Sequence, residues 1–391
     1  MSKKKYIIVN FLHGNGPYLR TTELAVAVND SLEKRGLPRL RIIVPWVYKL
    51  RQYEIIKQNF QHVLRRDPNE ILLDRHLGEL LGPLFYNEEK FEDTLNKLLT
   101  QSDSISRRLR EYFAAGLKVE NLAGEEIEVS EKDIVMEINR CPLLSFGVKP
   151  SYYTGFGYMS EILEKAMTEK AVAADRKLLK KGSEYYKKAE TDQALHFIAE
   201  PATFAYLGDR PKTYADEIMT PPNSNQSLKS NTLQKLLTRR GAYVTITGVY
   251  SRAHLFNEMY RVGLKIYTHK PSLIQKSRRA APSIILHKNI LLQFARIGWG
   301  SAWLSFFTRT PLITMPFYSH DDPEVYFNNV CIEKVGLGKI YNGESVKELL
   351  NWSGEYRANA DKMENYLLQK YGTVRGVPYT AEKIAEHFLS S

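Results

Sequence analysis

The sequence predicts an α/β protein with two domains, each built on a parallel sheet. Three observations carry this prediction. A strand, a glycine-rich turn, a helix and a second strand follow one another at the start of the chain. The same order returns near residue 242, and a segment rich in proline and small polar residues separates the two halves. A chain of 391 residues is long for one hydrophobic core and fits two.

In the first half, an apolar, β-branched run at residues 5–11 predicts a strand that ends in a glycine turn at 13–17. A patterned helix follows and stops at Gly36, and residues 41–44 form the next strand. Residues 48–115 are expected to be mostly helical. The apolar helix face that we expect there consists of Leu72, Leu73, Leu77, Leu80 and Leu81. A strand at 133–137 and a basic helical region at 160–188 come next, and residues 214–219 close this half.

In the second half, strands are expected at 242–248, 264–268, 283–286, 291–295 and 311–315. Helices are expected at 253–262, from the turn at 298–301 to 307, and at 325–335, 346–370 and 380–388. The resulting domains are 1–219 and 233–370, joined by a linker at 220–232. The segment 371–391 is expected to be a C-terminal helix that could cross back to the first domain.

The chain has a net charge of +11 and a pI near 9.3. A charge this large predicts an anionic partner, which could be nucleic acid, an anionic membrane or a phosphorylated ligand. Cys141 and Cys331 are the two cysteines, and neither has a neighbour at metal-ligand spacing. The N-terminal segment has no signal-peptide core, and the chain has no run of about 18 apolar residues. We therefore expect a soluble, cytoplasmic protein with reduced thiols.

A glycine turn between a predicted strand and a predicted helix is the first candidate binding segment. Glycines let a ligand approach the backbone, and the first N–H groups of a helix suit a diphosphate. We expect Ser301 to cap this helix, so that the free donors lie near Gly300 to Ala302. The candidate residues of this turn are Arg296, Gly298, Trp299, Gly300, Ser301 and Ala302.

An acidic segment that follows the next strand is the second candidate. Carboxylates accept hydrogen bonds from sugar or ribose hydroxyls, and Asp321, Asp322 and Glu324 could do so here. The two segments should lie side by side at the carboxyl ends of adjacent parallel strands. Either one alone is typical of an ordinary turn or of a solvated loop. Together, in this order, they favour a site for a nucleotide sugar.

The run from Ala295 to Gly298, the run from Pro311 to Ile313, then Pro316, Asp322, Asn328 and the run from Glu333 to Ile340 resemble the donor domain of GT-B glycosyltransferases. The likeness is greatest to the lipid-linked N-acetylglucosaminyltransferase of peptidoglycan synthesis, and the UDP-glycosyltransferases carry a related pattern. Residues 13–18 and Arg20 also look like that family's first glycine loop. The resemblance covers about fifty residues well and about twenty loosely.

This resemblance implies two Rossmann-like domains that face each other across a cleft, with residues 1–219 binding the acceptor and 233–370 the donor. It implies sugar transfer from a nucleoside-diphosphate sugar, most often a UDP-sugar, to an acceptor hydroxyl that is lipid-linked or membrane-associated. The transfer would be inverting and independent of metal, with the donor as co-substrate and no cofactor. Two departures stand out. The family's ribose-binding glutamate falls on Trp303 or Leu304, so either Glu324 binds the ribose or the nucleotide is held differently. Tyr18 replaces the histidine of the first glycine loop.

For the catalytic base we favour His13, with Glu23 as the runner-up, although a histidine at a strand end can also simply pack. We expect the leaving charge to be met by the helix start, by Ser251 and Arg252, and by Arg296. Arg252 could equally be a surface arginine. The nucleotide base should meet residues 286–290. The other donor-binding candidates are Gly14, Gly16, Gly248, His287 and Asn328.

Basic residues gather in two regions, with aromatic residues among them. The pattern suits an anionic membrane surface, would also suit nucleic acid, which we disfavour, and is otherwise a solvated helix face. Two further functions stay open: a nucleotide-sugar epimerase of the same fold, and a non-enzymatic, degenerate GT-B protein that binds an anionic surface. The regions comprise Lys170, Arg176, Lys177, Lys180, Lys181, Lys187 and Lys188, and Arg35, Arg39, Arg41, Lys49, Arg51, Arg65 and Arg66.

Overall fold

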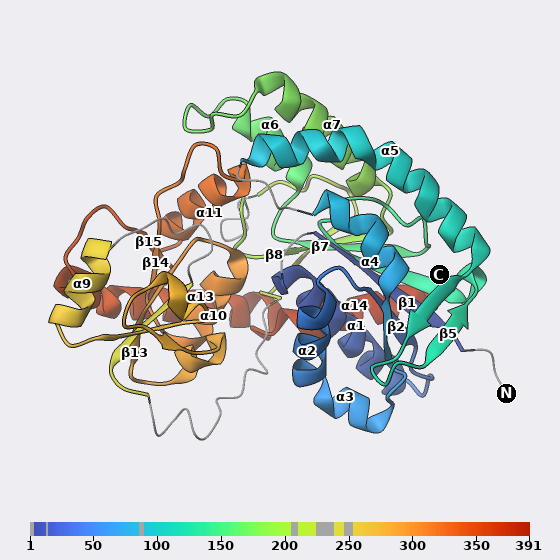
Figure 1. Cartoon of the computed structure of the whole chain (residues 1–391), viewed down its shortest axis with the longest axis horizontal. Helices are drawn as coiled ribbons and strands as arrows, with labels where there is room; N and C mark the ends of the chain where they lie inside the picture. Colours follow the sequence, from blue (N-terminus) through green and yellow to red (C-terminus); the bar gives the residue numbers. More distant parts are fainter. Residues whose placement is uncertain (1–3, 13–14, 86–89, 205–209, 224–237, 246–252) are drawn as a thin grey trace. The chain divides into compact units, whose positions relative to one another are not determined.

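The computed structural model describes residues 4–12, 15–85, 90–204, 210–223, 238–245 and 253–391. The chain divides into two compact units (Figure 1). Unit 1 comprises Met1–Ala199, Pro211–Thr220 and Gly376–Ser391, and unit 2 comprises Glu200–Arg210 and Pro221–Arg375. Neither unit is therefore one continuous stretch of sequence, because the chain passes between the units more than once.

Unit 1 is built on a sheet whose nine described strands have the order β5-β4-β3-β2-β1-β6-β7-β8-β9. Strands β1 to β3 and β6 to β9 are parallel, whereas β4 runs antiparallel to both β3 and β5. The strands are β1 (Tyr6–Phe11), β2 (Arg41–Pro45), β3 (Ile71–Asp74), β4 (Leu117–Glu120), β5 (Glu126–Val129), β6 (Ile134–Arg140), β7 (Ser151–Gly155), β8 (Leu195–Ala199) and β9 (Glu217–Thr220).

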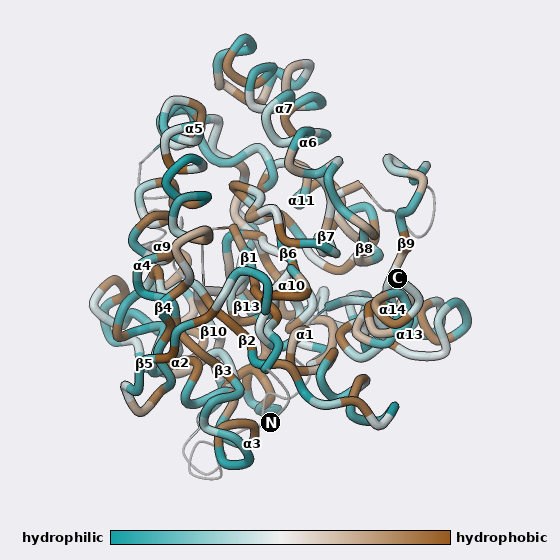
Figure 2. The backbone as a smooth tube through the Cα atoms, turned by 90° about the vertical axis from the view of Figure 1, so that its right-hand side faces the viewer, coloured by the Kyte–Doolittle hydropathy of each residue, from teal (hydrophilic) through white to brown (hydrophobic). Residues whose placement is uncertain are grey.

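Helices cover this sheet. They are α1 (Asn15–Glu33), α2 (Lys49–Asn59), α3 (Gln61–Arg66), α4 (Arg75–Leu81), α5 (Phe91–Ala115), α6 (Met159–Ala166), α7 (Arg176–Thr191) and α14 (Gly376–Ser390), with short 3-10 turns at Gly82–Leu84 and Glu131–Asp133. The strand interiors are fully buried, as Ile7 and Ile43 illustrate. In Figure 2, hydrophobic and hydrophilic residues alternate along α5, which fits a helix with one face against the core and one face outward.

The C-terminal helix α14 packs against α1 within unit 1. Arg35, just beyond α1, forms an ion pair with Glu382, and the Tyr152 hydroxyl lies 3.0 Å from Nδ1 of His387. The last helix therefore completes the first unit, although the second unit precedes it in sequence.

One expected helix face is wrong in part. Leu72 and Leu73 lie in strand β3, and the helix α4 that carries Leu77, Leu80 and Leu81 begins only at Arg75. The Asp74 carboxylate accepts a hydrogen bond from the N–H of Leu77 and so caps this helix. A short apolar run fits a buried strand as well as a helix, so periodicity alone could not separate the two.

Unit 2 is built on a sheet whose six described strands are all parallel and have the order β12-β11-β10-β13-β14-β15. These are β10 (Gly241–Thr245), β11 (Lys265–Thr268), β12 (Arg278–Arg279), β13 (Ile290–Ala295), β14 (Leu312–Thr314) and β15 (Lys339–Ile340). The helices are α9 (Ala253–Arg261), α10 (Trp299–Thr308), α11 (Pro323–Lys334), α12 (Val346–Asn351) and α13 (Ser353–Tyr371), with 3-10 turns at Pro271–Leu273 and Pro282–Leu286.

Residues 283–286, expected to be a strand, lie in the 3-10 turn Pro282–Leu286. Proline at the start of this turn has a fixed φ and no N–H, which favours a helical turn over a central strand. Ile284 and Ile285 are buried, so the apolar pattern is explained by packing of the turn onto the sheet.

Glu200 and Ala202 are held within unit 2 by side chains from much later in the chain. The buried Glu200 carboxylate accepts hydrogen bonds from Lys370 and Tyr371, each at 2.6 Å, and from Tyr366. The Cys331 thiol donates to the carbonyl of Ala202 at 2.9 Å. In the described part of the chain, no helix is long and apolar enough to cross a bilayer.

Candidate functional site

The strand order of unit 2 places its glycine turn at a topological switch point. From β10 the chain continues outward to β11 and β12, then returns to the other side of β10 as β13 and continues to β14 and β15. In open parallel sheets, ligands bind beyond the carboxyl ends of the two strands that flank such a reversal. Strand β13 ends at Ala295, and Arg296, Ile297 and Gly298 follow directly. Gly248, Ser251 and Arg252, which follow β10, lie outside the described residues.

The glycine turn leaves open space in front of the start of α10. A side chain added at Gly298 or Gly300 would meet no atom within 4 Å, and Gly298 has a φ of −153°, which any residue can adopt. Neither backbone strain nor internal packing therefore requires glycine here. What the two glycines provide is unobstructed access to the backbone.

The helix start differs from the expected one. Gly298, and not Ser301, is the N-cap, because α10 already begins at Trp299. The N–H groups of Ser301 and Ala302 donate to the Gly298 carbonyl at 2.9 and 3.1 Å. The groups that precede the first intrahelical bond are thus those of Trp299 and Gly300. The helix start, with its free N–H groups, therefore lies closer to β13 than the sequence predicts.

The acidic segment lies next to this turn, as the sequence predicts. Strands β13 and β14 are parallel neighbours, with Ala295 opposite Thr314, so the segments that follow them share one edge of the sheet. The Arg296 guanidinium binds the Asp321 carboxylate in a bidentate pair, with Nε–Oδ2 and Nη2–Oδ1 distances of 2.8 and 2.6 Å. This ion pair ties the acidic segment to the glycine turn.

Arg296 is therefore not a free cation. Burial opposes its charge, but the hydrogen bonds and the charge of Asp321 raise the pKa of the Arg296 guanidinium above its ordinary value. The arginine and the aspartate compensate each other's charge, so neither acts alone on a ligand. Their arrangement orders the two segments.

Asp322 and Glu324 have different environments, although they are two residues apart. Asp322 is the N-cap of α11: its carboxylate accepts from the N–H of Glu324 at 2.9 Å, and only 4% of the residue is exposed. Burial, then the nearby Glu324 charge, raises the pKa of the Asp322 carboxyl. Glu324 is half-buried and accepts a hydrogen bond from Nδ2 of Asn328 at 3.0 Å. Of the two, Glu324 is the one that a ligand hydroxyl could reach.

Trp299 and Asn328 meet in the interior. The Trp299 indole donates to Oδ1 of Asn328 at 2.8 Å and to the Thr203 hydroxyl at 3.1 Å, and Thr203 also donates to Asn328. All three residues are buried. Their side chains hold α10 against α11 and against the segment around Thr203. Thr203 carries no signal in the sequence, because it lies 96 residues from Trp299 and 125 residues from Asn328.

The position of the family's ribose-binding glutamate is closed in this structure. Trp303 is fully buried and stacks on Trp299 with ring centroids 5.4 Å apart. Leu304 is half-buried and packs against the core around Tyr243. Neither residue can replace a carboxylate that binds hydroxyls.

His287 lies at the opposite edge of the sheet from the glycine turn. It precedes β13, whereas Gly298 follows it, and a six-residue strand spans about 20 Å. The expected contact between the nucleotide base and residues 286–290 is therefore wrong. These residues lie at the amino edge of the sheet, because 283–286 form a 3-10 turn and not a strand. Nδ1 of His287 accepts from the N–H of Asn289 at 3.1 Å. Strand β11 is the parallel neighbour of β10 on its other side. The residues that follow β11, among them His269 and Lys270, do lie at the carboxyl edge of the sheet.

In unit 1, the candidate base His13 and its neighbour Gly14 lie outside the described residues. Gly16 is the second residue of α1, and a side chain there would meet nothing within 4 Å. Glu23 lies about 12 Å along α1 from its start, more than one turn in, and pairs with Arg20 at 2.5 Å. That pairing and distance disfavour Glu23 as a base.

Tyr18, which stands where the family has a histidine, is fully buried and packs against Phe11 and Tyr48. Burial raises the pKa of the Tyr18 phenol well above its ordinary value, so the residue stays protonated and cannot serve as a base near neutral pH. Within the described part of the chain, no three or more His, Cys, Asp or Glu side chains gather in a way that could hold a metal ion.

No protein-family model and no curated protein matches the chain by sequence. Solved structures match along its whole length. UGT71G1 of Medicago truncatula, complexed with UDP-glucose, is 13% identical with a TM-score of 0.60, and the match covers 99% of this chain and 98% of that one. UGT2 of Phytolacca americana, complexed with UDP-2fluoro-glucose and pterostilbene, is 11% identical with a TM-score of 0.59 and coverage of 99% and 100%. The glycosyltransferase SnogD of Streptomyces nogalater is 12% identical, with a TM-score of 0.53 and the same coverage.

At such low identity the likeness concerns the fold. The chain has the α/β GT-B fold of these glycosyltransferases, which confirms the fold class expected from the sequence.

Proposed function

We propose that this chain is a glycosyltransferase that moves a sugar from a nucleoside-diphosphate sugar, most simply a UDP-sugar, to an acceptor hydroxyl. One observation carries the proposal. The start of α10 is open at the switch point of its sheet, and the Arg296–Asp321 pair holds a carboxylate segment beside it. Proteins of the same fold have been solved with UDP-glucose and with a fluorinated UDP-glucose, which supports the choice of donor.

In this proposal the diphosphate lies against the N–H groups of Trp299 and Gly300, where the helix dipole also favours negative charge. The Glu324 carboxylate accepts hydrogen bonds from a ribose or sugar hydroxyl. Arg296 and Asp321 position the two segments, and Asp322 caps α11. Gly248, Ser251 and Arg252 stay predicted as further contacts to the leaving group.

The reaction would be a single displacement. The acceptor oxygen bonds to the anomeric carbon, the bond from that carbon to the phosphate oxygen breaks, and the nucleoside diphosphate leaves with the electron pair. The hydroxyl proton passes to a base, for which His13 stays the predicted residue. Inversion and independence from metal are part of this proposal and follow from the resemblance. An acceptor that is lipid-linked or membrane-associated follows from the same source.

A thermal-unfolding panel with UDP, GDP and TDP sugars tests donor binding. We expect one nucleotide class to raise the melting temperature, because a ligand that binds only the folded state stabilises it. If no member of the panel raises it, the proposal is wrong. Release of nucleoside diphosphate that depends on an added acceptor identifies a transferase. Conversion of the donor sugar without such release would identify the epimerase instead.

A further inference from the structure

Five lysines lie on one exposed face of α7. Their spacing follows the helical period, and all five are exposed. Glu184 is the one acidic residue on this face. From its first to its last member, the row is about 16 Å long. This lysine face consists of Lys177, Lys180, Lys181, Lys187 and Lys188.

The opposite face of α7 fixes the direction in which the lysines point. Leu179 and Tyr186 are buried there. A side chain at Gly182 would approach Leu163 and Leu95 to 2.8 and 2.9 Å, so the helix lies tightly against α6 and α5. Helix α7 therefore cannot rotate to hide its lysines without losing this packing.

The lysines of this face form no ion pair with a carboxylate of the described residues, although nearby Lys149 and Lys165 pair with Asp192 and Glu161. Like charges one helical turn apart repel each other and weaken a helix slightly. A row of five such charges that brings no internal stabilisation is typical of a surface that meets an anionic partner.

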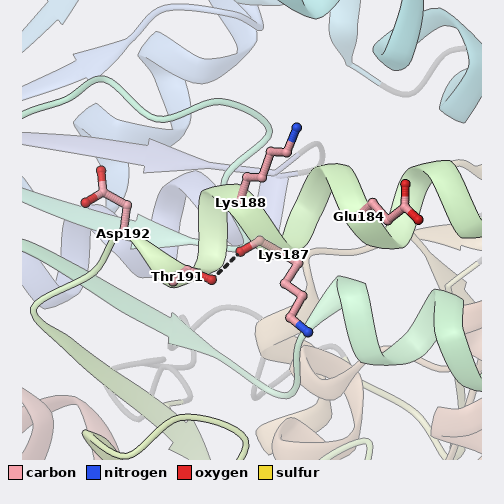
Figure 3. Close-up of a pocket in the computed structure, with 5 residues that line it drawn as sticks. All are labelled: Glu184, Lys187, Lys188, Thr191 and Asp192. Carbon is pink, nitrogen blue, oxygen red and sulfur yellow. Dashed lines mark hydrogen bonds between the residues drawn. The ribbon is translucent and has the colours of Figure 1, made fainter.

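The shape of the lysine face selects the kind of partner. Within this face, Lys187 and Lys188 leave the helix about 100° apart around its axis, and their side chains diverge and do not converge on one point (Figure 3). The depression of about 500 Å³ that they line with Glu184, Thr191 and Asp192 is open and contains two carboxylates. A single phosphate would find no built site there. Charges spread along a convex helix suit an extended anionic plane.

Two features disfavour nucleic acid as this partner. The aromatic residues of α7 are turned inward: the Tyr185 hydroxyl donates to the carbonyl of Leu143 at 2.7 Å, and Tyr186 is buried. No ring of this face is thus available for stacking on bases. The second feature is Arg176 at the start of the helix. Its guanidinium donates to the carbonyls of Ala166 and Glu169, so it is engaged within the fold and not directed at a phosphate.

We propose that the lysine face of α7 docks the protein on a bilayer that contains anionic phospholipids. The lysines act by adding their attractions to the negative surface potential within a Debye length of the headgroups. The inference stands on the charge and packing of α7 and is independent of the donor site. It would bring the catalytic protein to the surface that presents a membrane-associated acceptor, if the proposed function holds.

Co-sedimentation of the full chain with vesicles tests this inference. The protein should bind vesicles of phosphatidylcholine with phosphatidylserine, and not vesicles of phosphatidylcholine alone. The triple variant Lys177→Gln, Lys181→Gln and Lys188→Gln should lower the partition coefficient about a hundredfold, at about fivefold per lysine. Binding should also fall steeply with added salt.

A matched triple on unit 2 removes the same charge elsewhere. Lys288, Lys347 and Lys362 are exposed, and their change to glutamine should lower binding by less than about threefold. Three results would overturn the proposal: no preference of the wild-type chain for phosphatidylserine, an equal loss in both triples, or stronger binding to duplex DNA with the same sensitivity to the α7 triple. The UDP-induced rise in melting temperature, measured on the same samples, tests the donor site separately.

Discussion

Replacement of Gly300 by leucine should abolish donor binding without harming the fold. Gly300 is the exposed second residue of α10, and a side chain there meets no atom within 4 Å. Leucine also favours a helix over glycine by about 0.5–1 kcal/mol. We therefore expect the unliganded variant to melt about 1–4 °C above the wild type.

The effect on the ligand should be opposite in sign. A donor present at about 100 times its Kd stabilises the wild type by about 2.7 kcal/mol, which corresponds to a rise of roughly 5–10 °C. The leucine side chain at Gly300 occupies the space through which a diphosphate reaches the helix start, so the rise should shrink to about 1 °C or less.

Gly354→Leu is the matched control for this experiment. Gly354 is the second residue of α13, is exposed, and has equally open space around it. This variant should keep the full donor-induced rise. Thermal unfolding with and without UDP-sugar measures both variants. A Gly300→Leu protein that keeps its full rise would refute the placement of the diphosphate, and so would a loss in both variants.

Three further changes probe the acidic segment and the core of unit 1. Glu324→Gln keeps an acceptor for Asn328 but loses the charge, and should raise the Kd of the UDP-sugar about tenfold by calorimetry; an unchanged Kd would remove Glu324 from the site. Arg296→Lys loses the bidentate pair with Asp321 and should cost about 1 kcal/mol in urea unfolding, and the double variant with Asp321→Asn should cost less than the sum; additive losses would show that the pair is not coupled. Burial raises the pKa of Glu137 from 4.5 to about 7, so the folded state holds a proton that the unfolded chain releases, and stability falls as the pH rises from about 4.5 through 7. Glu137→Gln should remove that fall and gain on the order of 2 kcal/mol at pH 8, and equal pH dependence in variant and wild type would contradict the buried, protonated carboxyl.

The order of helices and strands along the chain was largely predictable from the sequence. The strand, glycine turn and helix at residues 290–308 are local features, because a mainly apolar run and a glycine pair predict them within about twenty residues. The adjacency of β13 and β14 followed from the chirality and spacing of βαβ units. The secondary structure predicted for two short apolar runs was wrong: Leu72 and Leu73 form a strand and not a helix, and residues 283–286 form a 3-10 turn and not a strand.

The candidate site was predictable as a region and less so as a set of contacts. Asp322 and Glu324 look alike in sequence, yet one is a buried cap and the other is half-exposed. Trp299 and Asn328 were expected beside the donor and lie in a buried network with Thr203. The roles of all of these residues toward a ligand stay predictions.

The sequence by itself determined the α/β class and the use of two largely parallel sheets, because both depend on residues close in the chain. It also predicts the segment in which a diphosphate would meet a helix start. Only the tertiary structure decided which N–H groups lie free at the start of that helix and which carboxylate stays accessible. It also decided that the charge of Arg296 is compensated by Asp321. The physical reason is that burial and ion pairing depend on elements that meet in space from distant parts of the chain, such as Thr203 against Trp299. No local pattern encodes those distances.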